Sequence, residues 1–203
     1  MTKLHATLML STLCLALSGC AQHTGGSGPS VVANTPNQGV AGADSTLDFL
    51  NESATPLRVF ANGVELGEVG AFESRGFIAG AGALALAVDR SDDFFTIRQP
   101  FRLVSLVTTQ RTLVVFEGFD RSPTLFASEG LIELDNETGN TLSVFVDGLP
   151  IGDLLPFSSC RIVADAGSYQ LGLDIEGDFL PQPFPFRWVD VQAGATTTAS
   201  FQP

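Results

Sequence analysis

The chain has 203 residues, of which 44% are hydrophobic, and its 10 basic and 22 acidic residues give a formal net charge of −12. This acidity argues against nucleic acid as a partner and disfavours binding to anionic membrane surfaces, because both attract basic proteins. The apolar content is sufficient to build a packed core.

The chain begins with features of an export signal. An apolar run of about 12 residues, from Ala6 to Leu17, follows Lys3 and His5. A membrane-spanning helix needs about 20 apolar residues, so the run is too short to span a bilayer. Its length is typical of the core of a signal peptide, which we predict over residues 1–19.

The apolar run ends in Leu-Ser-Gly-Cys, which resembles the lipobox of bacterial lipoproteins. The resemblance implies that Cys20 receives a diacylglyceryl group and becomes the first mature residue. Ala21 follows the cysteine where an aspartate would imply retention at the inner membrane, so the expected location is the outer membrane, on its periplasmic face or at the cell surface. The alternative is an ordinary signal peptide in which this cysteine has no role.

Residues 20–45 have a different composition from the rest of the chain. They are rich in Gly, Ser, Pro, Asn and Thr and contain few apolar residues. Such a segment cannot bury enough surface to order itself, which predicts a flexible tether. A coil of this length has an r.m.s. reach of about 25–30 Å.

The remainder of the chain contains an internal repeat. Residues 47–118 align without a gap to residues 132–203, at an offset of 85 positions, and about 22 of the 72 aligned positions are identical. This similarity indicates a duplication. We therefore predict two domains, over residues 46–118 and 132–203, joined by a linker over residues 119–131.

Within each copy the apolar residues alternate with a period of two. Leu142, Val144 and Val146 alternate with Ser143 and Phe145, and an Asp-Gly pair follows them. The first copy has Asn-Gly at the same place, and both pairs suit a tight hairpin turn. Short strands recur between turns and no window carries a helical stripe, so the fold class is all-β, with two tandem antiparallel β-sandwiches.

Several motifs of the second copy resemble a family. They are the pattern N-E-x-x-x-x-L-x-V-F-V-D-G, the stretch ADAGSYQLGLD and a final V-x-A-G-x-T-T-T. Together they resemble a bacterial secreted domain family of unknown function, and more loosely the PEGA-like surface domains. The resemblance covers both copies and implies tandem immunoglobulin-like domains in envelope proteins. Two departures are the phenylalanines Phe60 and Phe145, where the family often has tyrosine, and residues 110–112, which lack the usual Ala-Gly-x-x-Tyr.

The composition offers little for catalysis. Both histidines and the only lysine precede residue 46, so the repeats contain neither, and Cys160 has no histidine to activate it. We expect no enzyme activity, no cofactor and a half-exposed, unreactive thiol. Clustered acids offer weak calcium candidates, and a solvated turn is the alternative. These acids are Asp89, Asp92 and Asp93 in the first copy and Asp174, Glu176 and Asp178 in the second.

Three aromatic residues are candidates for a partner surface. Phe60 and Phe145 lie out of phase with the core residues that flank them, and Trp188 lies out of phase with the valines beside it. A matching pair in duplicated domains indicates either cover by a neighbouring strand or the sister domain, which we favour, or a surface that binds a partner.

The expected function is that of a non-catalytic lipoprotein of the outer membrane, which displays two β-sandwiches as an interaction or structural module of the envelope. The alternative is a module that binds polysaccharide. A row of exposed aromatics in one groove would favour polysaccharide. A flat apolar face or a free sheet edge would favour a protein partner.

Overall fold

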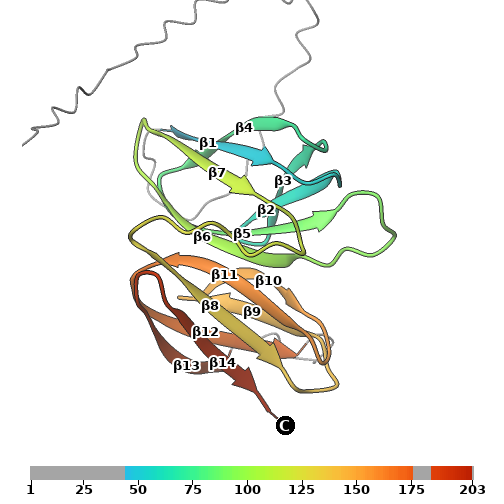
Figure 1. Cartoon of the computed structure of the whole chain (residues 1–203), viewed down its shortest axis with the longest axis vertical. Coiled ribbons are helices and arrows are strands. Elements are labelled where there is room, and N and C mark those ends of the chain that lie inside the picture. Colours follow the sequence, from blue (N-terminus) through green and yellow to red (C-terminus); the bar gives the residue numbers. More distant parts are fainter. Residues whose placement is uncertain (1–43, 176–183, 203) are drawn as a thin grey trace, which may run out of the picture. The chain divides into compact units, whose positions relative to one another are not determined.

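The computed structural model describes residues 44–175 and 184–202, which form fourteen β-strands (Figure 1). The first repeat contains β1 Asp44–Asn51, β2 Leu57–Ala61, β3 Val64–Val69, β4 Ser74–Gly80, β5 Gly82–Arg90, β6 Gln99–Leu106 and β7 Arg111–Phe116. The second contains β8 Glu129–Asn136, β9 Leu142–Val146, β10 Leu149–Leu154, β11 Ser159–Asp165, β12 Gly167–Ile175, β13 Phe184–Val191 and β14 Thr196–Phe201. The predicted signal peptide and the tether up to residue 43 lie outside the described residues.

Each repeat arranges its strands in two sheets, and both repeats use the same order. In the first repeat the strands are ordered β4-β1-β7 and β3-β2-β5-β6, and in the second β11-β8-β14 and β10-β9-β12-β13. The edge strand β6 also pairs with the edge strand β11, which joins two of these sheets into one seven-stranded sheet that runs through both repeats, in the order β14-β8-β11-β6-β5-β2-β3. The all-β, immunoglobulin-like sandwich is therefore confirmed. Its strand order differs from the ABED and CFG sheets of a constant immunoglobulin domain. The first and last strands of each repeat pair in parallel, which the alternation of apolar residues did not predict.

The two predicted hairpin turns have the expected geometry. Asn62 and Asp147 begin the turns with φ of 50° and 51°, and the glycine after each has φ of 77°. Two consecutive positive φ angles match the twist of the flanking strands. The side chain of each turn residue also accepts a backbone hydrogen bond from the neighbouring strand of the sheet. Ala85 N of β5 donates to Asn62 Oδ1, and Gln170 N of β12 donates to Asp147 Oδ1, both at 2.8 Å.

A buried asparagine at the same end of each sandwich forms hydrogen bonds to the backbone of the neighbouring loops. Asn51 donates to the carbonyls of Thr55 and Gly70, at 2.8 and 2.9 Å, and its Oδ1 accepts the Ser53 N–H. Asn136, 85 positions later, makes the equivalent bonds to residues 140, 155 and 138. Because each amide satisfies backbone groups that would otherwise be buried without partners, the repeated Asn-Glu motif has a structural role.

Each repeat has its own hydrophobic core. The first is formed by alternate residues that include Leu47, Phe49, Leu57, Val59, Leu86 and Val88. The second includes Ile132, Leu134, Leu142, Val144, Val146, Leu171, Val189 and Val191. The predicted inward set of β9 is therefore confirmed.

The described strands extend into the segment predicted to be a linker. β8 begins at Glu129, inside the stretch 119–131. Gly130 explains the early start, since a Cβ atom at this position would lie 2.3 Å from the carbonyl oxygen of Gln192. Only glycine allows β8 to pass this close to the turn between β13 and β14.

Candidate functional site

The candidate site is the side of each four-stranded sheet that points away from the core of its own repeat, which we call the outer face. In the first repeat its residues alternate with the core residues of β2 and β5. They are Phe60, Ala85, Ala87 and Leu103, and their counterparts in the second repeat are Phe145, Gln170, Gly172 and Trp188.

The outer face of the first repeat is buried. Ala85 is 1% exposed and Phe60 is 5% exposed, although neither belongs to the core of the first repeat. Ala85 instead packs in the core cluster of the second repeat, and Leu103 packs against the same cluster. The second repeat therefore covers this face.

The strand β10 packs over this face, and β11 lies beside its edge strand β6 in the same sheet. Asp153 N donates to Arg98 O at 2.7 Å, and Val163 of β11 pairs with Arg102 of β6. A Cβ atom at Gly152 would lie 2.1 Å from Arg98 O, so the approach of β10 requires a glycine at this position.

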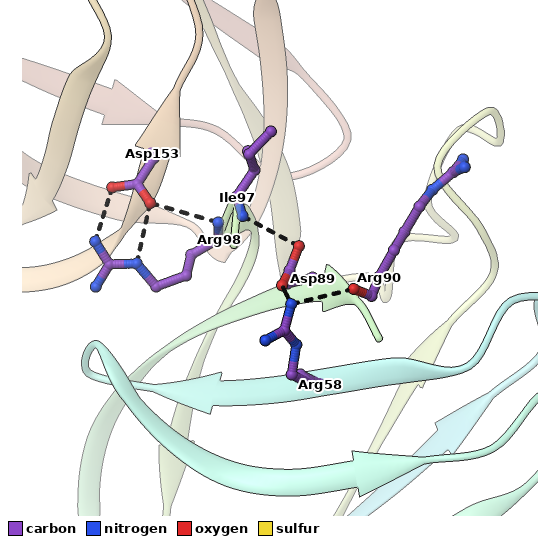
Figure 2. Close-up of polar contacts among 6 residues, drawn as sticks. All are labelled: Arg58, Asp89, Arg90, Ile97, Arg98 and Asp153. Atoms are coloured by element: carbon purple, nitrogen blue, oxygen red, sulfur yellow. Dashed lines mark hydrogen bonds and ion pairs between the residues drawn. The ribbon is translucent and has the colours of Figure 1, made fainter. Parts of the chain in front are cut away.

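Two ion pairs accompany the apolar contact. Arg98 donates two hydrogen bonds of 2.9 and 3.0 Å to the carboxylate of Asp153 (Figure 2), which is a bidentate ion pair. Arg102 pairs with Glu129 at 2.6 Å, and both side chains are almost fully buried. A buried pair fixes a specific arrangement more reliably than it adds stability.

The outer face of the second repeat has a different environment. Trp188, the counterpart of Leu103, is 65% exposed, and Phe145, the counterpart of Phe60, is half-buried. Trp188 therefore faces outward, as its phase in the sequence indicated. Phe60 lies beneath the second repeat, which is the alternative that we favoured for it, so this candidate is not accessible to a partner.

A different pair of phenylalanines is exposed in both repeats. Phe72 and Phe157 occupy equivalent turns, their side chains are exposed, and their φ angles are 57° and 52°. No function was predicted for this pair. The repeated phenylalanine was visible in the alignment, but its exposure depends on a turn conformation that bulky residues adopt rarely.

The described acidic residues among the calcium candidates do not converge on a common site. Asp89 is buried, forms an ion pair with Arg58 and accepts the Ile97 N–H at 3.1 Å (Figure 2). Burial raises the pKa of Asp89, and the Ile97 N–H and Arg58 partly oppose this shift. Asp92 and Asp93 are exposed and Asp174 is half-buried. Glu176 and Asp178 lie outside the described residues, and within those residues no three His, Cys, Asp or Glu side chains converge as metal ligands.

Cys160 is more deeply buried than expected. Its side chain lies in the core of the second repeat, and burial raises the pKa of its thiol to about 12. The prediction of a half-exposed thiol is therefore wrong. It rested on the aligned residue Arg75, which is exposed because its guanidinium reaches outward to the carbonyl of Glu68.

Comparisons with known proteins do not assign a family. No protein-family model and no curated protein matches the chain. Among solved structures, the Bacillus anthracis TIE protein is 8% identical, with 79% of this chain and 34% of that chain covered, at a TM-score of 0.28. GBS52, the minor pilin of Streptococcus agalactiae, is 10% identical, with 79% and 94% covered, also at 0.28. The chain spans about a third of the first of these proteins, and TM-scores this low carry no argument about function.

In the part of the chain that the structure describes, no helix is long and apolar enough to cross a membrane.

Proposed function

We propose that the protein is a non-catalytic lipoprotein of the outer membrane that docks a partner protein on the outer face of its second repeat. The observation that supports the proposal most strongly is the contrast between Leu103 and Trp188. The two residues occupy the same position in duplicated sandwiches, but Leu103 packs beneath the neighbouring repeat and Trp188 is 65% exposed. Exposed tryptophan is a frequent anchor residue of protein interfaces.

The arrangement in the first repeat indicates what kind of partner fits. There the outer face is covered by the edge strand β10 of another β-sandwich. The partner of the second repeat is therefore expected to present a comparable strand edge. The free face carries the exposed acids Asp147 and Asp190 and the half-buried Asp174, so the matching edge should carry arginine or lysine.

A second copy of this chain fits the face less well. The equivalent edge strand of the first repeat, β3, carries Glu65 and Glu68, which would meet an acidic face. Arg98 of the first repeat, which pairs with Asp153, also has no equivalent in the second repeat, where Pro183 stands at this position. Like charges opposed across an interface disfavour association, so we propose a different protein as partner.

Polysaccharide binding has less support. Sugar-binding surfaces stack their ligands on exposed aromatic rings, and a row of such rings in one groove was the expected sign. On the described part of this outer face, Trp188 is exposed but Phe145 is only half-buried. A single ring supports a protein anchor better than a sugar platform.

Photo-crosslinking in intact cells tests the docking surface. Trp188→p-benzoylphenylalanine should crosslink to one protein. The control variant is Leu113→p-benzoylphenylalanine, which places the same group at an exposed position of β7 and should not crosslink to it. The captured protein, once purified, should bind the wild type at least tenfold more tightly than it binds the Trp188→Ser variant. Its affinity for the Leu113→Ser variant should equal its affinity for the wild type. Crosslinks only to a second copy, or equal affinities for both variants, would contradict the proposal.

The lipid anchor is tested separately. The Leu-Ser-Gly-Cys motif supports acylation of Cys20, so Cys20→Ala should release the protein from the membrane fraction or halt its processing. Cys160→Ala is the matched control, since the thiol of Cys160 is buried and should not affect membrane association. Unchanged association of the Cys20→Ala variant would contradict the anchor.

A further inference from the structure

One end of the second sandwich contains an open cavity of about 430 Å³. Its walls are mainly apolar and come from β9, β12, β13 and β14. The apolar lining residues are Leu142, Leu173, Ile175, Pro185, Phe186 and Phe201. This cavity lies at the end of the sandwich, and Trp188 is not among its lining residues, although Asp174 of the outer face is.

The first repeat fills the corresponding space with an aromatic ring. Phe119, which follows β7, packs edge-on against Phe116, with ring centroids 5.1 Å apart. The guanidinium of Arg90 lies 4.9 Å from the centroid of the same ring. Phe116 and Arg90 are the counterparts of Phe201 and Ile175, which line the open cavity of the second repeat.

The turn that returns Phe119 to the sandwich depends on glycine. Gly118 has φ of 129°, a backbone conformation that side chains rarely permit. Pro203 stands at the equivalent position of the second repeat, and the proline ring restricts φ to about −65°. The second repeat therefore cannot fill its cavity by the same turn of its own chain.

The neighbouring rings also differ between the repeats. In the first repeat Phe101 lies between Phe49 and Phe116, with ring centroids at 5.9 and 5.5 Å, and is half-buried. Its counterpart Phe186 contacts Phe201 at 4.5 Å but is 42% exposed. Among the described residues, the stack of rings in the second repeat therefore ends at Phe186 and Phe201, which line the cavity.

We propose that this cavity binds an aromatic side chain carried by an extended segment of a partner protein. The first repeat shows that the space accepts a phenylalanine ring at the end of a strand. Apolar contact with the phenylalanines and leucines of the wall supplies the attraction. Ile175 replaces Arg90 at the rim, so the second repeat offers an apolar rim where the first has a cation.

A peptide with the sequence of residues 117–121 (EGFDR), blocked at both ends, is a suitable probe because it contains the segment that fills the first cavity. Titration of the full-length protein should produce saturable NMR shifts at the methyl groups of Leu142, Leu173 and Ile175. The same peptide with alanine in place of phenylalanine should bind at least tenfold more weakly. No shift at these methyl groups, or equal binding of the two peptides, would overturn the proposal.

Four variants sharpen the test. Ile175→Trp should block the cavity and abolish the shifts, while Leu113→Trp, a change at an exposed position of β7, should not. Phe119→Ala should open the first cavity and add a second binding site. Tighter binding of the peptide to the Phe179→Ser variant would overturn the proposal, because the ring of Phe179 in the chain itself would then be the occupant of the cavity. Loss of crosslinking at Trp188 would leave these results unaffected, so the two proposals fail separately.

Discussion

The two repeats have the same fold but expose different parts of it. In the first repeat the outer face is buried and no described strand pairs with the outer edge of β4, so Phe60 is 5% and Ile78 is 60% exposed. In the second repeat the edge is buried and the face is free, so Val163, the counterpart of Ile78, is fully buried and Trp188 is exposed.

This difference shows that two copies of one fold have different surroundings in the same chain. Among the described residues, β10 packs over the outer face of the first repeat and β11 pairs with its edge strand β6. On the equivalent face of the second repeat Trp188 is exposed, which is why the proposed docking surface lies there.

The largest predicted effect tests whether the two folds are equivalent. Asn51→Ala and Asn136→Ala each remove a buried amide that binds three backbone groups, which should cost about 3–5 kcal/mol of unfolding free energy, at roughly 1–3 kcal/mol per unsatisfied group. Urea denaturation of the two variants measures these costs. A large loss in one variant and none in the other would show that the repeats are stabilised differently.

The second prediction contrasts the two outer phenylalanines. Phe60→Ser should lower the unfolding free energy by about 2–3 kcal/mol, because a buried ring is lost. Phe145→Ser should lower it by about 1 kcal/mol or less, because that ring is only half-buried. The same denaturation experiment compares them, and equal losses would mean that the two faces have the same environment.

The third prediction concerns the glycines of the two edge strands. Gly152→Ala places a Cβ atom 2.1 Å from the carbonyl oxygen of Arg98 and should weaken the contact between the repeats. In Gly67→Ala the nearest atom is the guanidinium of Arg75 at 3.3 Å, which can move. Both glycines have positive φ, so each variant loses about 1–2 kcal/mol to backbone strain. Thermal melting should show a further loss only in Gly152→Ala.

The last predicted effect is absent at neutral pH, appears only at alkaline pH and belongs to the second repeat. Burial raises the pKa of the Cys160 thiol from 9.0 to about 12, so above pH 9 the unfolded chain releases a proton that the folded chain retains. Stability should therefore fall as the pH rises from 9 towards 12, by up to about 1.4 kcal/mol per pH unit. The unfolding free energy of the Cys160→Ala variant, measured by urea denaturation, should fall less steeply across this pH range. An identical slope would contradict the burial.

The sequence predicted the features that depend on local chemistry. The alternation in β9, the Asn-Gly and Asp-Gly turns and the gapless offset of 85 residues were sufficient for the sandwich fold and its hairpins. The parallel pairing of β1 with β7 was not predictable, because period-two alternation is the same in parallel and antiparallel strands.

The environment of the outer faces depended on contacts that alternation cannot reveal. Phe60 and Phe145 have the same phase in their strands, yet only the first lies beneath another repeat. One sign was present in the sequence. The first repeat has Ala85 and Ala87 where the second has Gln170 and Gly172, and two alanines on an outer face indicate close packing.

The most direct test of the central claim uses the only tryptophan in the chain, Trp188. Acrylamide should quench the fluorescence of the wild type strongly, because this ring is 65% exposed. The double variant Leu103→Trp, Trp188→Leu moves the ring to the equivalent position of the first repeat, where a cavity of about 70 Å³ beside Leu103 gives it room. Its fluorescence should shift to shorter wavelength and resist quenching. Equal quenching in the two proteins would contradict the claim that one outer face is covered and the other free.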